Sequence, residues 1–174
     1  MSDTITEIEL KFVKEDDEVL HSPAQPWSSD LGIDPENLVK EMLSIMLVNN
    51  GIGLAAPQVG LPISVFVMGN ADASYACFNP RVISVSSERA QTQEGCLSYP
   101  GLYLNIKRPT SVVAEYEDVK GETHRKEFTG ILATVFLHEF DHLHGICFVD
   151  RASDLSVKLA KQRVRKNLKK QGIK

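Results

Sequence analysis

The sequence predicts an α+β fold, with mostly antiparallel strands packed around a buried central helix and a further helix at the C-terminus. Apolar residues recur at helical spacing in 34–50 and again in 131–145. Several strand-like segments lie between these two helices, and they follow one another through turns instead of alternating with helices. The 174 residues, 43% hydrophobic and 24% charged, fit one globular domain, which we expect to span 1–174 as a single unit.

The first predicted helix, 34–50, has clear signals at both ends. Asp34 stands at the N-cap position and Pro35 at the first helical position. The pair Asn50–Gly51 is typical of a helix end. The apolar stripe that we expect to face the core consists of Leu38, Met42, Ile45 and Met46.

The middle of the chain reads as strands and tight connections. GIGLAAPQVG, at 51–60, is a loop of small residues. The expected strands are 63–68, one or two short strands within 75–85 broken at Pro80, and a hairpin of 111–117 with 123–128 around Gly121.

The second helix, 131–145, carries the stretch HEFDHLHG. His138 and His142 are four residues apart and share one helical face, so both rings can bind one metal ion, and Glu139 can then act on water at that ion. The helix is apolar over much of its circumference, which predicts burial. Buried histidines need partners, either a metal or other side chains of the core.

Two histidines leave a third ligand to be found. The metzincin pattern would place a histidine where this chain has Phe148, so that pattern fails. His144 lies about 200° around the helix from His142 and faces away, as a surface or capping residue. A downstream acidic ligand, Asp150 or Asp154, would fit a metallopeptidase that cleaves peptide bonds, and this alternative stays open.

An upstream candidate is Cys96 in QEGCLSYPG, which we interpret as a short rigid loop that ends at Pro100–Gly101. Three cysteines, an odd and sparse number, argue against a disulfide framework. The other two, Cys77 and Cys147, stand in apolar surroundings, and we expect them to be buried and structural.

The small-residue loop offers two kinds of group to a ligand. Gly51 and Gly53 allow close backbone approach, and Gln58 brings a side-chain amide that can hold a developing oxyanion. The alternative is a tight helix-to-strand connection in which Gln58 bonds only to backbone.

Taken together, GIGLAAPQ, EGCLS and HEFDH resemble, in this order and spacing, the three signature motifs of peptide deformylase. The resemblance extends from the first helix to Gly145. It implies an enzyme that removes the N-formyl group from the N-terminal methionine of nascent polypeptides and releases formate. A compact bacterial-type form is implied, because the long insertions of some branches are absent.

The resemblance also implies roles for individual residues. The metal ligands would be Cys96, His138 and His142, holding one divalent ion per chain, Fe²⁺ as the native metal with Zn²⁺, Ni²⁺ or Co²⁺ as alternatives. Glu139 would move the proton, while the Gln58 amide and the Leu97 backbone N–H hold the oxyanion.

The substrate would be held mainly by apolar side chains and strand-like backbone. The expected lining residues are Ile131, Thr134, Val135, Ile52 and the stem of Glu94, with Gly53 and Gly95 as backbone partners of the peptide. Two departures from the family pattern are Leu137, where Gln is frequent, and Tyr103, where Arg is frequent.

The C-terminus is strongly basic. From Lys158 onward there are eight Lys or Arg and no Asp or Glu, against a net charge of -4 for the whole chain. We expect residues 153–174 to form a basic helix that begins near Ser153 or Asp154. Such a helix is either a solvated face or a contact for a polyanion, and ribosomal RNA is the polyanion that the resemblance suggests.

The acidic N-terminus lacks a secretory signal, so we expect a cytoplasmic protein with no membrane or DNA partner. A third reading of the motifs, besides deformylase and metallopeptidase, is a metal-stabilised peptide- or ribosome-binding protein without turnover. Glu139 and Gln58 speak against that reading, because both are groups that catalysis needs.

Overall fold

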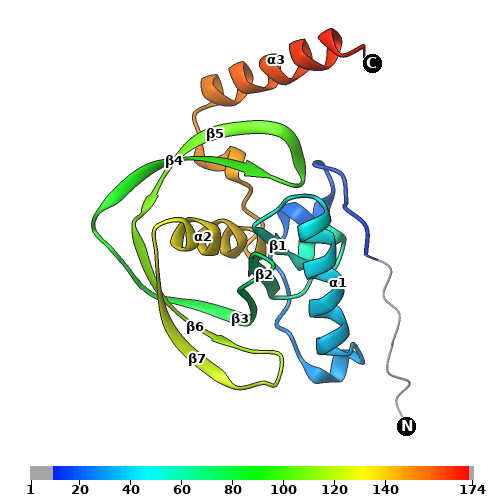
Figure 1. The fold of residues 1–174 in the computed structure, drawn as a ribbon, viewed down its shortest axis with the longest axis vertical. Coiled ribbons are helices and arrows are strands. Elements are labelled where there is room, and N and C mark those ends of the chain that lie inside the picture. The colour runs from blue at the N-terminus through cyan, green and yellow to red at the C-terminus, as the bar shows by residue number, and fades with distance from the viewer. Residues whose placement is uncertain (1–9, 173–174) are drawn as a thin grey trace.

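The computed structural model describes residues 10–172 (Figure 1). Its elements are α1 (Pro35–Val48), β1 (Gly53–Ala55), β2 (Val65–Gly69), β3 (Ser74–Val85), β4 (Arg89–Cys96), β5 (Tyr99–Pro109), β6 (Ser111–Glu117), β7 (Thr123–Thr129), α2 (Ile131–Leu143) and α3 (Asp154–Lys170), with four 3₁₀ turns, η1 (Glu18–His21), η2 (Ser29–Leu31), η3 (Ala56–Val59) and η4 (Phe148–Arg151). The expected α+β class is confirmed.

Two antiparallel sheets surround α2. The larger has the order β1-β2-β3-β6-β7, and β4 with β5 forms a separate long hairpin. Figure 1 shows α2 in the middle of the molecule, between this hairpin and the larger sheet, with α1 outside β1 and β2. The helix that carries the histidines is therefore enclosed by strands.

Helix α1 follows its sequence signals. The Asp34 carboxylate accepts a hydrogen bond from the Glu36 N–H at 3.1 Å. Leu38, Met42 and Met46 are fully buried, whereas Ile45 is only half-buried. The helix ends at Val48 with Asn49 as its C-cap, and Asn50 follows with φ 55°, in the left-handed region. The helix thus fixes the start of the GIGLAAPQVG segment.

Helix α2 is buried on most sides, as its composition predicts. Phe136 lies at its centre and contacts Phe66 of β2 edge-to-face and Phe128 of β7 in a stacked arrangement, with ring centroids 5.1 and 5.3 Å apart. The helix ends at His144, and Gly145 follows with φ 71°. Aromatic packing of this kind holds the helix in one register against the sheet.

Residues 21–25, here called the N-terminal arm, cross the C-terminal end of α2. The Ala24 N–H donates to the Leu143 carbonyl at 2.9 Å, and Pro23 forms an isolated bridge with His144. A Cβ on Gly145 would lie 2.7 Å from the carbonyl carbon of His21, so only glycine fits under the arm. The arm therefore covers the end of the helix.

The expectation of strands broken at Pro80 is wrong. β3 continues through this proline as one strand, with a register shift between Phe78 and Arg81 and with Asn79 at φ 47°. Proline has no N–H for a ladder hydrogen bond, and the bulge removes the need for one at that position.

The region around Cys96 also differs from expectation. Cys96 is the last residue of β4, not part of a loop, and it pairs with Tyr99 across a turn of Leu97 and Ser98. Pro100 and Gly101, which were expected to end the segment, lie within β5. β4 carries polar residues on both faces, so it lacks the apolar alternation that predicts a strand.

Candidate metal centre

Cys96, His138 and His142 come together from the end of β4 and from one face of α2. Cys96 Sγ and one ring nitrogen of each histidine lie within 4.8 Å of one another. Cys96 Sγ is 3.3 Å from His142 Nε2, and the two imidazole centroids are 5.1 Å apart. One thiolate and two imidazoles at this spacing are a donor set for a transition metal such as zinc or iron.

Glu94 orients the first histidine. His138 Nδ1 is 2.9 Å from Glu94 Oε2, which leaves Nε2 facing Cys96 and His142. Burial raises the pKa of Glu94, but the hydrogen bonds from His138 and Arg108 outweigh it, and the pKa lies below its usual value. A carboxylate behind a ligating histidine fixes the ring's orientation and tautomer.

The histidines have opposite protonation tendencies. Burial lowers the pKa of His138, yet its bonds to Cys96 and Glu94 prevail and raise it to about 10. Burial, with His138 close by, holds the pKa of His142 well below its usual range. His142 is therefore neutral and ready to act as a ligand.

Glu139 is buried beside the three ligand atoms and has an unused oxygen. Its Oε2 makes no hydrogen bond to the described residues, and neither does His142 Nδ1. Burial raises the pKa of Glu139 to about 7. A buried carboxylate oxygen without a partner is costly unless a bound group satisfies it. The residues present therefore fit a metal ion with a water molecule or substrate next to Glu139.

Gln58 lies in η3 and reaches the same site. Its Oε1 accepts from the Ala55 N–H at 2.8 Å, which fixes the amide. Its Nε2 points to Ser98 Oγ at 3.1 Å and to Cys96 Sγ at 3.4 Å. The reading of Gln58 as a purely structural amide accounts for the first bond, but its NH₂ group faces the ligands.

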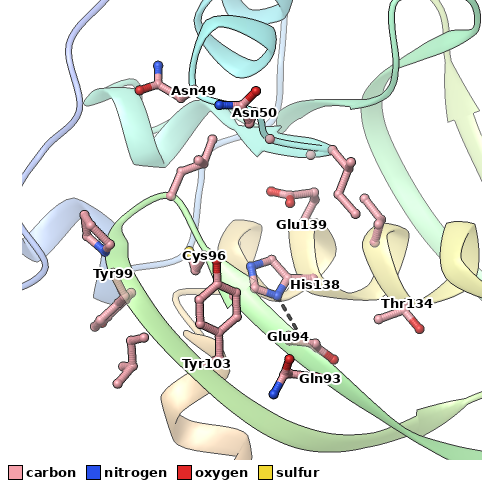
Figure 2. Close-up of a pocket in the computed structure, with 18 of the residues that line it drawn as sticks. Asn49, Asn50, Gln93, Glu94, Cys96, Tyr99, Tyr103, Thr134, His138 and Glu139 are labelled. Carbon is pink, nitrogen blue, oxygen red and sulfur yellow. Dashed lines mark hydrogen bonds and ion pairs between the residues drawn. The ribbon is translucent and has the colours of Figure 1, made fainter. Parts of the chain in front are cut away.

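A cavity of about 630 Å³ opens over these groups (Figure 2). All the expected substrate residues line it, namely Ile52, Gly53, Glu94, Gly95, Ile131, Thr134 and Val135, together with Gln58, Cys96, Leu97, His138 and Glu139. Thr134 and Val135 are buried, whereas Ile52 and Ile131 are more than half exposed at the mouth. The sequence did not predict two further parts of the lining, which are 99–103 on one side and Asn49 with Asn50 on the other (Figure 2).

Comparison with known proteins identifies the family to which the chain belongs. The sequence model of the family described as polypeptide deformylase matches residues 9–158. The chain belongs to the polypeptide deformylase family. The peptide deformylase of Prochlorococcus marinus (strain NATL2A) is 37% identical over 171 residues, which cover 94% of this chain and 83% of that relative. That of Synechococcus sp. (strain RCC307) is 43% identical over 122 residues, which cover 67% of this chain and 61% of that relative.

Solved deformylase structures share the fold. The crystal structure of the Thermotoga maritima enzyme has a TM-score of 0.78 and 33% identity and covers 84% of this chain and 99% of its own. A Synechococcus elongatus peptide deformylase in complex with actinonin has a TM-score of 0.80 and 34% identity, with coverage of 100% and 92%. The expectation of a hydrolase that removes the N-formyl group from nascent polypeptides is confirmed at the level of the family, and the metallopeptidase alternative is not favoured.

The other positions considered for a third ligand do not join the group of Cys96, His138 and His142. Phe148 is buried with its ring 5.8 Å from that of His138, and exposed His144 bonds through Nδ1 to the Phe140 carbonyl. Asp150 accepts from the Cys147 N–H, and Asp154 begins α3. Cys77 and Cys147 are buried, as expected, and neither joins Cys96, His138 and His142 in the group of candidate ligands among the described residues. No helix within 10–172 is long and apolar enough to span a membrane.

A buried ionic network lies behind the site, and the sequence did not predict it. Arg108 donates to Glu94 at 2.6 and 3.0 Å and to Asp141 at 2.8 Å, and Arg151 also donates to Asp141. Asp141 lies inside HEFDH on a helix expected to be buried, so its need for a cation could have been anticipated. Which cationic side chains pair with Asp141 depends on tertiary contacts, so the sequence alone does not identify them.

Proposed function

We propose that Cys96, His138 and His142 hold one divalent ion and that Glu139 moves the proton in the hydrolysis of the N-formyl group. The observation that carries this proposal is the buried, unpartnered Oε2 of Glu139 beside three converging ligand atoms. A divalent ion in such a site lowers the pKa of water at its open position and polarises a carbonyl oxygen. Glu139, with a pKa near 7, is suited to accept a proton and return it to the leaving amine.

The developing oxyanion would be held by two groups near Cys96, the side-chain amide of Gln58 and the backbone N–H of Leu97. The Gln58 NH₂ group is fixed by the bond from Ala55 to its carbonyl oxygen. Leu97 follows Cys96 in the turn, where its backbone N–H is the second proposed donor. Donors fixed before the reaction need no reorganisation when charge develops, which is the basis of their effect on rate.

The methionine side chain would enter between α2 and the Ile52 segment. Thr134 and Val135 provide the buried wall and Ile131 the outer one, with Ile52 and the stem of Glu94 opposite. The peptide backbone would run between Gly53 and Gly95. β1 is the edge strand of the larger sheet and β4 belongs to a two-stranded sheet, so both have an edge for an added strand.

For the metal we propose Fe²⁺ as the native ion, with Zn²⁺, Ni²⁺ and Co²⁺ as ions that the same donors accept. The thiolate and imidazole donors suit both iron and zinc. Metal analysis of protein purified without oxygen, after expression in iron-supplemented medium, distinguishes these ions. A stoichiometric metal other than iron in that preparation would contradict the choice of Fe²⁺.

The decisive experiment is formate release from a formyl-Met peptide by anaerobic Fe²⁺-loaded protein. We expect turnover by the unaltered chain, loss of turnover with metal retained in Glu139→Ala, and loss of metal in Cys96→Ala. Absence of formate with stoichiometric metal bound would overturn the assignment, and a Cys96→Ala protein that keeps its metal would overturn the ligand set.

We further propose a cytoplasmic location and a contact with the ribosome through α3. This helix buries only Ala160 among its described residues, and its remaining surface is rich in Lys and Arg. Exchanging Lys158, Arg165 and Lys169 for Gln is expected to weaken ribosome binding, most strongly at low salt. The same exchange should leave peptide turnover unchanged. Equal ribosome binding at every salt concentration would rule out this contact.

A further inference from the structure

An ion-pair chain runs from the surface of the molecule to the metal site. It begins at Arg151, whose side chain is 45% exposed, and continues through buried Asp141 and Arg108 to Glu94. Glu94 bonds to His138 Nδ1, the ring nitrogen opposite the one that faces the other ligands. Every step is a charge-assisted hydrogen bond, the strongest kind of polar contact in proteins.

Arg151 completes the charge balance of this chain. The buried part consists of two carboxylates, Glu94 and Asp141, and one guanidinium, Arg108, all at most 6% exposed. Arg151 donates from two nitrogens to Asp141, with Nε at 3.0 Å from Oδ2 and Nη2 bonded to Oδ1. Arg108 already bonds to both carboxylates, so without Arg151 it would be the only guanidinium left for the two of them.

The geometry places this contact where it acts on the metal helix. Asp141 lies next to His142 and three residues after His138 on α2. Arg151 ends η4, and Phe148 at the start of the same turn packs on the His138 ring. η4 therefore contacts α2 at two places, through the packing of Phe148 on His138 and through the ion pair of Arg151 with Asp141.

We infer that Arg151 is a positioning residue of the metal site, which acts on His138 through Asp141, Arg108 and Glu94. It lines no part of the substrate cavity, so it does not contact the peptide. Loss of Arg151 frees one end of Asp141, lets Arg108 shift toward it, and weakens the hold of Glu94 on the His138 ring. The inference rests on the proposed ligand set.

The test compares Arg151→Met with Lys161→Met in the full chain. Lys161 is the matched control, because its side chain is 43% exposed, it pairs with Glu15 at 3.6 Å, and it does not line the substrate cavity. For each protein the rate of Zn²⁺ transfer to a chromogenic chelator and the visible spectrum of the Co²⁺-loaded form are measured. Formate release then gives kcat and KM.

In Arg151→Met we expect metal transfer to be roughly tenfold faster, the low end of the effects seen for partners behind a ligand. A changed Co²⁺ spectrum, a lower kcat and an unchanged KM should accompany it. Arg151→Lys keeps the charge but only one of the two bonds, so intermediate values are expected. Lys161→Met should match the unaltered protein.

Metal transfer and Co²⁺ spectrum in Arg151→Met equal to those of Lys161→Met would overturn the inference, as would a change confined to KM. A purely structural role would lower the melting temperature while these two readouts stayed the same, and that also counts against it. If the unaltered chain binds no Zn²⁺ or Co²⁺ at Cys96, the proposed ligand set itself fails, which is a separate outcome.

Discussion

The carboxylate of Glu139 occupies the space that a side chain at position 53 would need. A Cβ built on Gly53 would stand 2.8 Å from Glu139 Cδ and still closer to Oε1. Gly53 begins β1, and Glu139 belongs to α2, so the contact joins the edge of the sheet to α2. The glycine is required here by close approach and not by its backbone angle.

Gly53→Ala is therefore expected to displace Glu139 and to lower kcat by about a hundredfold, the effect of an ångström-scale misplacement of a reacting group. Formate release at saturating peptide measures it. Gly121→Ala is the control: φ 79° in an open hairpin strains the backbone without touching the site, so it should lower stability but not kcat. Full activity in Gly53→Ala would show that Glu139 does not need this position.

Gln58→Glu distinguishes the role of the amide oxygen of Gln58 from that of its NH₂ group. The substitution keeps an oxygen for the Ala55 N–H and removes the NH₂ donor that faces Cys96. We expect kcat to fall by about 10² to 10³, as for the loss of one oxyanion donor. Stopped-flow measurement of formate release gives kcat, and circular dichroism checks that the fold is kept. A loss seen only in KM would mean that Gln58 binds substrate without stabilising charge.

The stability of the folded protein should fall in acid because Glu94 becomes protonated. Its pKa is lowered in the folded chain from the usual 4.5, so its ionised form contributes stability above that pH, and this contribution is lost as pH falls through the lowered pKa. Glu94→Gln should therefore be less stable than the unaltered chain above pH 4.5, with a difference that shrinks in more acidic solution. Urea unfolding of the metal-free proteins at a series of pH values measures this difference.

The control for that series is Glu115→Gln, which removes a surface partner of Arg81. Exposed pairs contribute little, so we expect a free-energy change below about 1 kcal/mol at any pH. A difference between Glu94→Gln and the unaltered chain that stays constant into acid would contradict the assigned pKa shift.

The three thiols should differ sharply in reactivity after metal removal. Burial raises the pKa of Cys147 to about 11 and that of Cys77 further still, so neither forms much thiolate near neutral pH. Cys96 lies at the cavity and is partly exposed. Alkylation of the chelated protein, followed by mass spectrometry, should modify Cys96 first. Restored Zn²⁺ should protect it, and early modification of Cys77 would contradict the structure.

The sequence predicted those parts of the site that depend on local spacing. His138 and His142 share a helical face wherever the helix is placed, and Cys96 and Gln58 belong to short motifs that the resemblance identified. The site residues reach one cavity, although the roles assigned to them stay predictions until tested.

The ionic network that contacts His138 through Glu94 could not be predicted in the same way. Glu94, Arg108, Asp141 and Arg151 come from β4, β5, α2 and η4, and no spacing pattern relates them. β4 was missed because its buried face carries Thr92 and Glu94 instead of an apolar alternation. Glu94 was expected to offer only its stem to the substrate, whereas its carboxylate orients His138.

The N-terminal arm has a consequence for the order in which the chain can complete its fold. Ala24 and Leu143, joined by a backbone hydrogen bond, are more than a hundred positions apart, and Gly145 packs under His21. During synthesis the arm emerges first and must wait for almost the whole domain before its partner exists. The Leu143 carbonyl at the end of α2 lacks this donor until then, so the contact closes late, and a chain cut short before position 143 cannot make it.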